Sequence, residues 1–290
     1  MSRPLPASST MLEMGLIEFT GAVLLTSVLA GLLGALTGLG GGVVIVPALV
    51  LLFHVDLRYA IGASLISVIA TSSGAAVSFV REGFSSVRIG MFLEVATTLG
   101  ALGGAYLTAR VSTRAIGIIF GITLLYSAWS SFRAKHDQMQ YPPNALAEKL
   151  ELRGDYPTTN GREAYIAQNV PAGFGIMFIA GILSGLLGIG SGAVKVLAMD
   201  HAMKLPFKVS TTTSNFMIGV TAAASAGIYL SRGYIAAGLV APVMLGVLAG
   251  SVAGARMLVR IRVPVLRVIF ALVIVALGVE MIYSGATGGL

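Results

Sequence analysis

Long apolar runs alternate with short polar stretches along the chain and predict a series of membrane-spanning helices. An α-helix needs roughly 20 predominantly apolar residues to cross the hydrocarbon core of a bilayer. Eight runs approach or reach that length, at 16–36, 59–80, 89–109, 115–132, 172–187, 209–230, 235–255 and 265–283. The pattern therefore predicts an all-α integral membrane protein.

The two halves of the chain repeat one another at an offset of 150 residues. Residues 30–48 read AGLLGALTGLGGGVVIVPA and residues 180–198 read AGILSGLLGIGSGAVKVLA, with ten of nineteen positions identical. The register continues downstream, where Phe120 corresponds to Phe270. A self-similar pattern of this kind predicts one structural unit used twice.

One apolar segment in each half is too short to span a bilayer as a helix. These segments are Gly42 to Phe53 and Gly192 to Met203. Twelve helical residues rise about 18 Å, whereas the hydrocarbon core is about 30 Å thick. Either each segment crosses with the help of sunken loops, giving five crossings per half, or it re-enters and leaves on the same side, giving four.

The distribution of lysine and arginine favours five crossings, because cytoplasmic loops are enriched in these residues. Five crossings place most basic residues on one face, among them Arg81, Arg88 and those of the central linker, and leave few on the other, such as Arg58, Arg110 and Arg232. Four crossings would divide them evenly. An odd number per half predicts two repeats of inverted topology, with both termini periplasmic and the linker cytoplasmic.

The expected organisation is an N-terminal transmembrane repeat at 1–133, a linker at 134–169 and a C-terminal transmembrane repeat at 170–290. The linker is the one long polar stretch, and its charged central piece is expected to form a helical turn or a strand pair. Glycine rows such as Gly100 with Gly104 suit close helix packing, either within one chain or across a homodimer.

The glycine-rich turns before the two short segments are candidate anion sites. Their residues are Gly40, Gly41 and Gly42 in the first half, and Gly190, Ser191 and Gly192 in the second. A helix that starts after such a turn directs free backbone N–H groups at its surroundings, which favours a bound anion. The alternative is that these glycines serve only helix packing.

Lys195 is the strongest single candidate for a functional residue, because it lies within an apolar segment and corresponds to Ile45 of the first repeat. An ionisable group there costs roughly 3 kcal/mol on insertion scales and is a functional candidate by default. It could pair with an anionic substrate or carry a proton. The structural alternative is that its amino group reaches the membrane surface.

Further polar groups follow Lys195 along the chain. The row at 210–215 includes Thr212, Thr213, Ser214 and Asn215, which are candidate substrate contacts, although Ser and Thr in membrane helices often bond their own backbone. Glu94 is a second charge within an apolar run. It is a candidate proton site, a partner for Lys195, or an interfacial carboxylate.

Composition narrows the function classes. The formal charge of +7 is scattered rather than clustered with aromatic residues, which argues against nucleic-acid binding. The chain has no cysteine and only three histidines, and no metal, cofactor or catalytic motif is visible. An enzyme is therefore not expected, whereas a transporter or a small-anion channel is.

Three stretches resemble the paired signatures of the sulfite exporter TauE/SafE family of membrane permeases. They are TGLGGGVVIVPALV, its degenerate copy LGIGSGAVKVLAMD, and KVSTTTSNFMIG. The copy departs from the pattern at Ser191, within the second glycine triplet, and at Leu197, which replaces the proline found at Pro47. The resemblance implies a secondary transporter of small sulfur-containing anions such as sulfite, sulfonates or thiosulfate. The size of the chain and its lack of targeting features suit a bacterial inner membrane.

Overall fold

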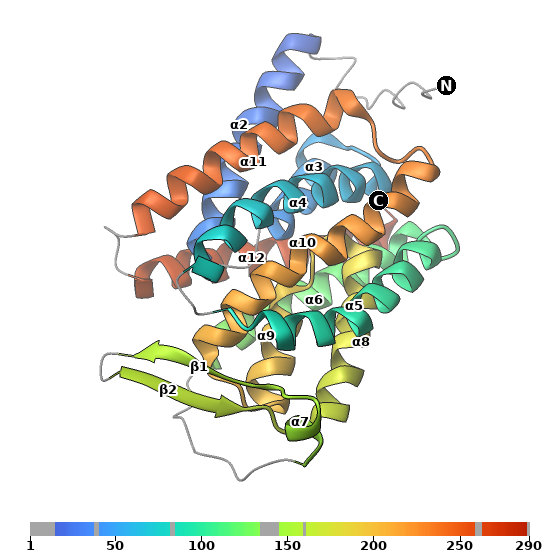
Figure 1. The fold of residues 1–290 in the computed structure, drawn as a ribbon. Coiled ribbons are helices and arrows are strands. Elements are labelled where there is room, and N and C mark those ends of the chain that lie inside the picture. The colour runs from blue at the N-terminus through green and yellow to red at the C-terminus, as the bar shows by residue number, and fades with distance from the viewer. Residues whose placement is uncertain are drawn as a thin grey trace.

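The protein is a bundle of helices in a computed structural model, which describes residues 15–37, 41–81, 85–133, 145–158, 161–258 and 263–288 (Figure 1). The first half holds α2 (Leu16–Thr37), α3 (Gly42–Phe53), α4 (Leu57–Arg81), α5 (Val87–Leu107) and α6 (Thr113–Arg133). The second half holds α8 (Val170–Leu187), α9 (Gly192–Leu197), the π-helix η1 (Ala198–Ala202), α10 (Phe207–Ser231), α11 (Ala237–Leu258) and α12 (Val263–Thr287).

Four of the described helices are long and apolar enough to cross a membrane, namely α2, α5, α8 and α11. Shorter apolar helical stretches lie in α3, α4, α6 and α12. The predicted all-α membrane fold is therefore confirmed. The four long helices also form two pairs at the 150-residue offset, α2 with α8 and α5 with α11.

Both long helices of each half pack against a long helix of the other half. Helix α11 lies along α2, and α5 lies along α8. A Cβ atom on Gly31 would lie 2.2 Å from the carbonyl oxygen of Val247, and one on Gly181 would lie 2.2 Å from that of Thr97. These two contacts are equivalent under the 150-residue offset. Such recurrence supports the duplication, whereas the inverted orientation of the halves in a bilayer stays a prediction.

The glycine rows of α5 and α11 pack within the chain. A Cβ on Gly104 would lie 2.1 Å from the carbonyl oxygen of Ile182, and one on Gly250 would lie 2.0 Å from that of Val28. These positions therefore hold helices together inside one molecule, as small residues commonly do in membranes. The predicted homodimer stays a prediction, and it does not draw on these rows.

The two short segments differ in their helical form. Helix α3 covers Gly42–Phe53, as the sequence predicts, and ends at His54 in a left-handed conformation. The second segment is α-helical only to Leu197 and continues as a π-helix. The amide of Met203 bonds the carbonyl of Ala198, five residues earlier, at 3.0 Å. Widened turns of this kind often occur at functional sites.

The linker contains both elements that its sequence suggests. Helix α7 (Ala145–Lys149) precedes an antiparallel hairpin of β1 (Arg153–Thr158) and β2 (Gly161–Ile166). The piece is docked on the helices: Leu152 is buried in one cluster with Ile89 and Met203, and Arg88 pairs with Glu151. The described part of the linker is therefore packed against the helices, and it lies at the lower end of the bundle in Figure 1.

Three of the basic residues lie at the two ends of α5. Arg88 lies at its start, beside the hairpin. At its other end, Arg232 donates to the carbonyl of Ala105 at 2.9 Å, and Arg110 donates to the hydroxyl of Tyr106 at 3.1 Å. This separation matches the grouping on which the five-crossing topology rests. Which end faces the cytoplasm stays a prediction.

We expect Gly100→Ala to destabilise the bundle, because the new Cβ would lie 2.2 Å from the carbonyl oxygen of Phe178. Forcing apart two packed backbones should cost about 1–3 kcal/mol. Gly103→Ala is the matched control on the same helix, since nothing lies within 4 Å of its Cβ position. Thermal unfolding in detergent measures the stability of both variants. Equal melting temperatures would contradict the close packing of α5 against α8 at Gly100.

Candidate functional site

Lys195 lies in the interior of the bundle, with none of its side chain exposed. It sits one turn into α9, where its backbone amide bonds the carbonyl of Ser191 at 3.0 Å. Its Nζ donates to Oγ1 of Thr221 on α10 at 2.5 Å. The amino group is therefore held inside the protein, and the alternative that it reaches the membrane surface does not fit this geometry.

Thr221 joins Lys195 to Glu94. Oγ1 of Thr221 lies 2.6 Å from Oε1 of Glu94 on α5, which is 8% exposed. The hydroxyl of Thr98 donates to the same oxygen at 3.1 Å. We call Lys195, Thr221 and Glu94 the buried triad. It connects one helix of the first half with two elements of the second.

The carboxylate of Glu94 lies close enough to the amino group of Lys195 to compensate its positive charge. Nζ of Lys195 and Oε1 of Glu94 contact the same hydroxyl oxygen, so they lie within about 5 Å of each other. At an effective dielectric constant of about 20, two unit charges at that distance attract by about 3 kcal/mol. Because a buried charge without a partner is strongly destabilising, Glu94 supports the enclosed position of Lys195.

The turn between α8 and α9 lies close to the triad and is itself buried. Gly188 and Gly190 have φ angles of 67° and 70°, and Ser191 has a φ of 47°. Left-handed backbone is unstrained for the two glycines but costs free energy at a serine. The side chain of Ser191 is 2% exposed, and its hydroxyl has no hydrogen-bond partner among the described residues. Such strain is commonly stored at functional sites.

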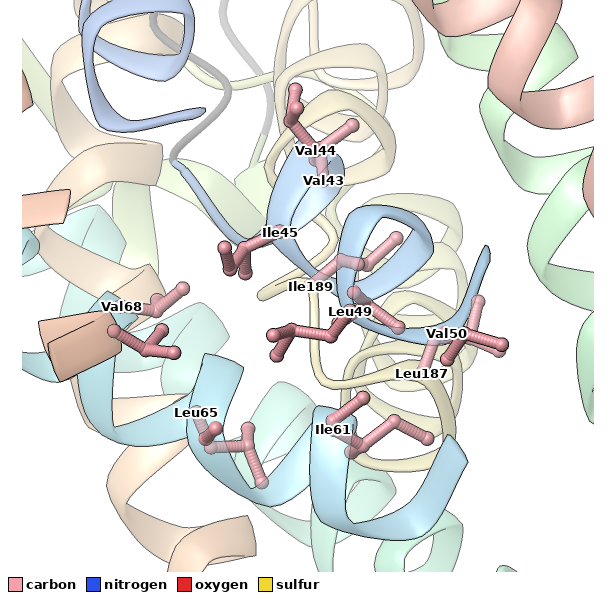
Figure 2. Close-up of a cluster of buried hydrophobic side chains, with 14 of the residues drawn as sticks. Val43, Val44, Ile45, Leu49, Val50, Ile61, Leu65, Val68, Leu187 and Ile189 are labelled. Carbon is pink, nitrogen blue, oxygen red and sulfur yellow. The ribbon is translucent and has the colours of Figure 1, made fainter. Parts of the chain in front are cut away.

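The turns of the two halves meet at the centre of the bundle. Ser64 of α4 donates to the carbonyl of Gly188 at 2.8 Å, and a Cβ on Gly42 would lie 3.3 Å from the same oxygen. Of the first turn, Gly41 and Gly42 are described and buried, whereas Gly38 and Gly40 lie outside the described residues. Figure 2 shows the surrounding apolar side chains of α3, α4, the end of α8 and the second turn: Val43, Val44, Ile45, Leu49, Val50, Ile61, Leu65, Val68, Leu187 and Ile189.

The glycines of the second turn are covered by neighbouring isoleucines. A Cβ on Gly188 would lie 2.6 Å from Cγ2 of Ile61, and one on Gly190 would lie 2.6 Å from Cγ2 of Ile218. Gly192 packs against Ile218 as well. Both readings of these glycines from the sequence thus keep some support: they line the centre of the bundle, and in this conformation they are packed.

The predicted hydroxyl row divides into different roles. Ser214 donates to the carbonyl of Gly192 at 3.2 Å and so touches the turn. Thr213 accepts from the amide of Ser86 at 3.0 Å, and Thr212 donates to the carbonyl of Lys208 in its own helix at 2.9 Å. Asn215 is half-buried. The structure brings Ser214 to the turn, whereas these bonds of Thr212 and Thr213 fasten helix ends.

Thr221 is the member of the triad that sequence reasoning missed. It follows Ser214 by seven residues, which places both on one face of a helix. Ser210, Ser214, Thr221 and Ser225 are all buried along α10. Polar groups that recur at helical spacing within an apolar run mark the face directed at the bundle interior. This periodicity could have predicted that Thr221 faces the bundle interior, but the dense row of polar residues at 210–215 drew the prediction to those positions instead.

Comparison with known proteins identifies the family. A sequence profile described as Sulfite exporter TauE/SafE matches residues 23–281, which is most of the chain. The chain belongs to this family. Two relatives from Bacillus subtilis (strain 168) are similar to the TauE/SafE chain described here. Probable membrane transporter protein YunE is 26% identical over 265 residues, covering 89% of this chain and 95% of the relative.

Probable membrane transporter protein YdhB is 26% identical over 235 residues, covering 81% of this chain and 88% of the relative. No solved structure matches the TauE/SafE chain. Family and fold together make it a multi-pass membrane transporter embedded in a lipid bilayer. The expectation that the protein is a transporter and not an enzyme is confirmed by the family.

We expect Thr221→Val to destabilise this TauE/SafE protein, because Lys195 and Glu94 would lose the hydroxyl that both contact. Leaving buried polar groups unpaired costs about 1–3 kcal/mol or more when they are charged. Thr221→Ser keeps the hydroxyl and is the matched control. Thermal unfolding of the purified variants measures the effect. Equal melting temperatures for the valine and serine variants would show that the bridge contributes nothing.

Proposed function

We propose that the protein is a secondary transporter of small sulfur-containing anions, such as sulfite, organosulfonates or thiosulfate, that works by alternating access. In this proposal the two halves are inverted repeats in a bacterial inner membrane, with periplasmic termini and a cytoplasmic linker. The observation that carries it is the enclosed amino group of Lys195 beside the meeting point of the two glycine turns.

A positive charge at this place suits an anionic substrate. In the described part of the chain, Lys195 is the only lysine or arginine with a buried side chain. It lies one turn from Ser191, and its partner Thr221 shares α10 with Ser214, whose hydroxyl contacts the second turn. We assign charge recognition to Lys195. Backbone N–H groups at Gly40–Gly42 and Gly190–Gly192 and polar groups at Thr212–Asn215 would supply further contacts.

Access to this site requires movement of the packed elements. Ile61 and Ile218 cover the second turn in the conformation seen here, and they belong to α4 and α10 from different halves. These two helices lie against each other at the centre of the bundle. A rocking motion between halves would separate them and uncover the turn from one side at a time, which is the usual logic of repeat-based transporters.

The substrate class rests on the family description together with the chemistry of the site. Sulfite and sulfonates are small and carry oxygen atoms that accept hydrogen bonds from N–H, hydroxyl and ammonium groups. The names of the two relatives state only that they are probable membrane transporters. Glu94 and Lys195 are also the proposed groups for proton coupling, because both are enclosed and linked through Thr221.

A thermal-shift screen with sulfite, thiosulfate, sulfoacetate, taurine, sulfate and acetate selects the anion. Uptake of the labelled anion into proteoliposomes by counterflow then separates a transporter from a channel, since only a carrier drives uptake in exchange for internal anion. We expect saturable counterflow for a sulfur-containing anion and none for acetate. Flux that neither saturates nor shows counterflow would contradict the proposed mechanism.

We expect Lys195→Ala to reduce counterflow at least about tenfold, because an anion in a desolvated site would lose the buried amino group that pairs with its charge. Lys149→Ala is the matched control, since Lys149 is an exposed lysine on α7 outside the bundle. Its counterflow should equal that of the unmodified protein. Undiminished counterflow in the Lys195 variant would rule out the assigned site.

A further inference from the structure

We propose that Glu94 is an internal counter-ion which holds the charge of Lys195 when no substrate is bound and which the substrate anion displaces. This inference rests on the proposed transport function and specifies how its site is regulated. It predicts that Glu94 governs the return of the empty carrier. Without Glu94, the protein would still exchange one anion for another across the membrane, but it would no longer carry out net efflux.

The first support is that Glu94 and Lys195 meet only through a hydroxyl that has another acceptor. A threonine hydroxyl donates one proton. The proton of Thr221 can go to Oε1 of Glu94 at 2.6 Å or to the carbonyl of Met217 at 2.9 Å. If Glu94 withdraws, Thr221 keeps a partner within its own helix and still accepts from Lys195. Separation therefore leaves no unpaired hydroxyl.

The second support is that the Glu94 carboxylate is hydrogen-bonded at only one of its two oxygens among the described residues. Its Oε1 accepts from Thr98, which is on the same helix and would remain its partner after separation. Its Oε2 is enclosed and has no hydrogen-bond partner among the described residues. A carboxylate can accept hydrogen bonds at both oxygens. One that is half satisfied is bound less firmly to its place than a carboxylate that a lysine or arginine contacts directly.

The third support is where the partners come from. Glu94 belongs to α5 of the first half, whereas Lys195 and Thr221 belong to α9 and α10 of the second. A shift of α5 against α10 would make or break the contact. The other buried carboxylate in the described region, Asp200, lies in η1 with His201 at 3.6 Å and so has a different neighbour. Glu94 is therefore the buried carboxylate that is placed to compensate the charge of Lys195.

The physical requirement follows from the buried charge. A lysine without compensation is expensive inside a membrane protein, so every conformation that encloses Lys195 needs a nearby negative charge. In the loaded carrier the substrate anion supplies it. In the empty carrier Glu94 supplies it, which permits the return step. Net transport needs both steps, whereas exchange of one anion for another needs only the loaded carrier.

The test is Glu94→Gln, which keeps the shape and removes the charge. Proteoliposomes loaded with labelled sulfite are diluted either into sulfite-free buffer, which measures net efflux, or into buffer with unlabelled sulfite, which measures exchange. We expect net efflux to fall at least about tenfold while exchange stays within about twofold. Glu148→Gln removes an exposed carboxylate on α7 and should leave both rates unchanged.

Two outcomes would overturn the inference while leaving the transport function intact. Equal loss of efflux and exchange would make Glu94 part of substrate binding or of the fold, and an undiminished net efflux would show that the empty carrier does not need it. If Glu94→Gln does not yield folded protein, Glu94→Asp replaces it. The aspartate keeps the charge on a shorter side chain, so the inference then expects a loss confined to net efflux.

Failure of the transport function itself would look different. Absence of sulfite exchange in the unmodified protein, or full exchange in Lys195→Ala, would remove the basis on which Glu94 was assigned. A selective loss of net efflux in the glutamine variant can arise only if the unmodified protein transports the anion. The two proposals are thus tested by separate measurements on the same vesicles.

Discussion

The enclosed amino group of Lys195 is the constraint on which the account depends. The bilayer offers no water to solvate it, so the protein must supply a polar partner and an opposite charge. Thr221 provides the first and Glu94 the second, from helices of different halves. The free energy of this arrangement is therefore sensitive to how the halves sit against each other. A substrate anion that offers a second source of negative charge can shift that balance.

Glycine contacts between helices set the distances within which this chemistry takes place. Gly31 against Val247 and Gly181 against Thr97 let α2 approach α11 and α8 approach α5 until their backbones touch. Because these contacts join the two halves, α5 packs chiefly on α8 and α10 of the second half. Glu94 lies on that helix only one turn before Thr97, so helix packing fixes its height relative to Lys195.

Much of the fold follows from the sequence because hydrophobic length and internal repetition are strong signals. The apolar runs predict the long helices, and the bounds of α3 agree with the segment from Gly42 to Phe53. The π-helix after Leu197 was not predicted, since a change from four-residue to five-residue bonding leaves no periodicity in so short a stretch. The packing of Leu152 against the helices was also not predicted, because it depends on tertiary contacts that the sequence pattern does not encode.

The site was only partly predictable for a similar reason. Lys195 and Glu94 stand out because charges are rare in apolar runs, but their link through Thr221 requires the angular position of three helices at once. The row at Thr212 and Thr213 attracted attention by its density. The structure shows that the Thr212 hydroxyl bonds the carbonyl of Lys208 in its own helix, as Ser and Thr often do in membrane helices. The Thr213 hydroxyl instead accepts from the amide of Ser86, which precedes α5.

Labelling of a single cysteine at the second turn tests the central claim most directly. The chain contains no cysteine, so Ser191→Cys introduces a lone thiol at a buried hydroxyl position beside Lys195. The account predicts that a membrane-impermeant thiol reagent labels this position in vesicles and that a transported sulfonate slows the labelling. A turn that stays unlabelled from both sides of the membrane, or labelling that no anion affects, would contradict a substrate site at this turn.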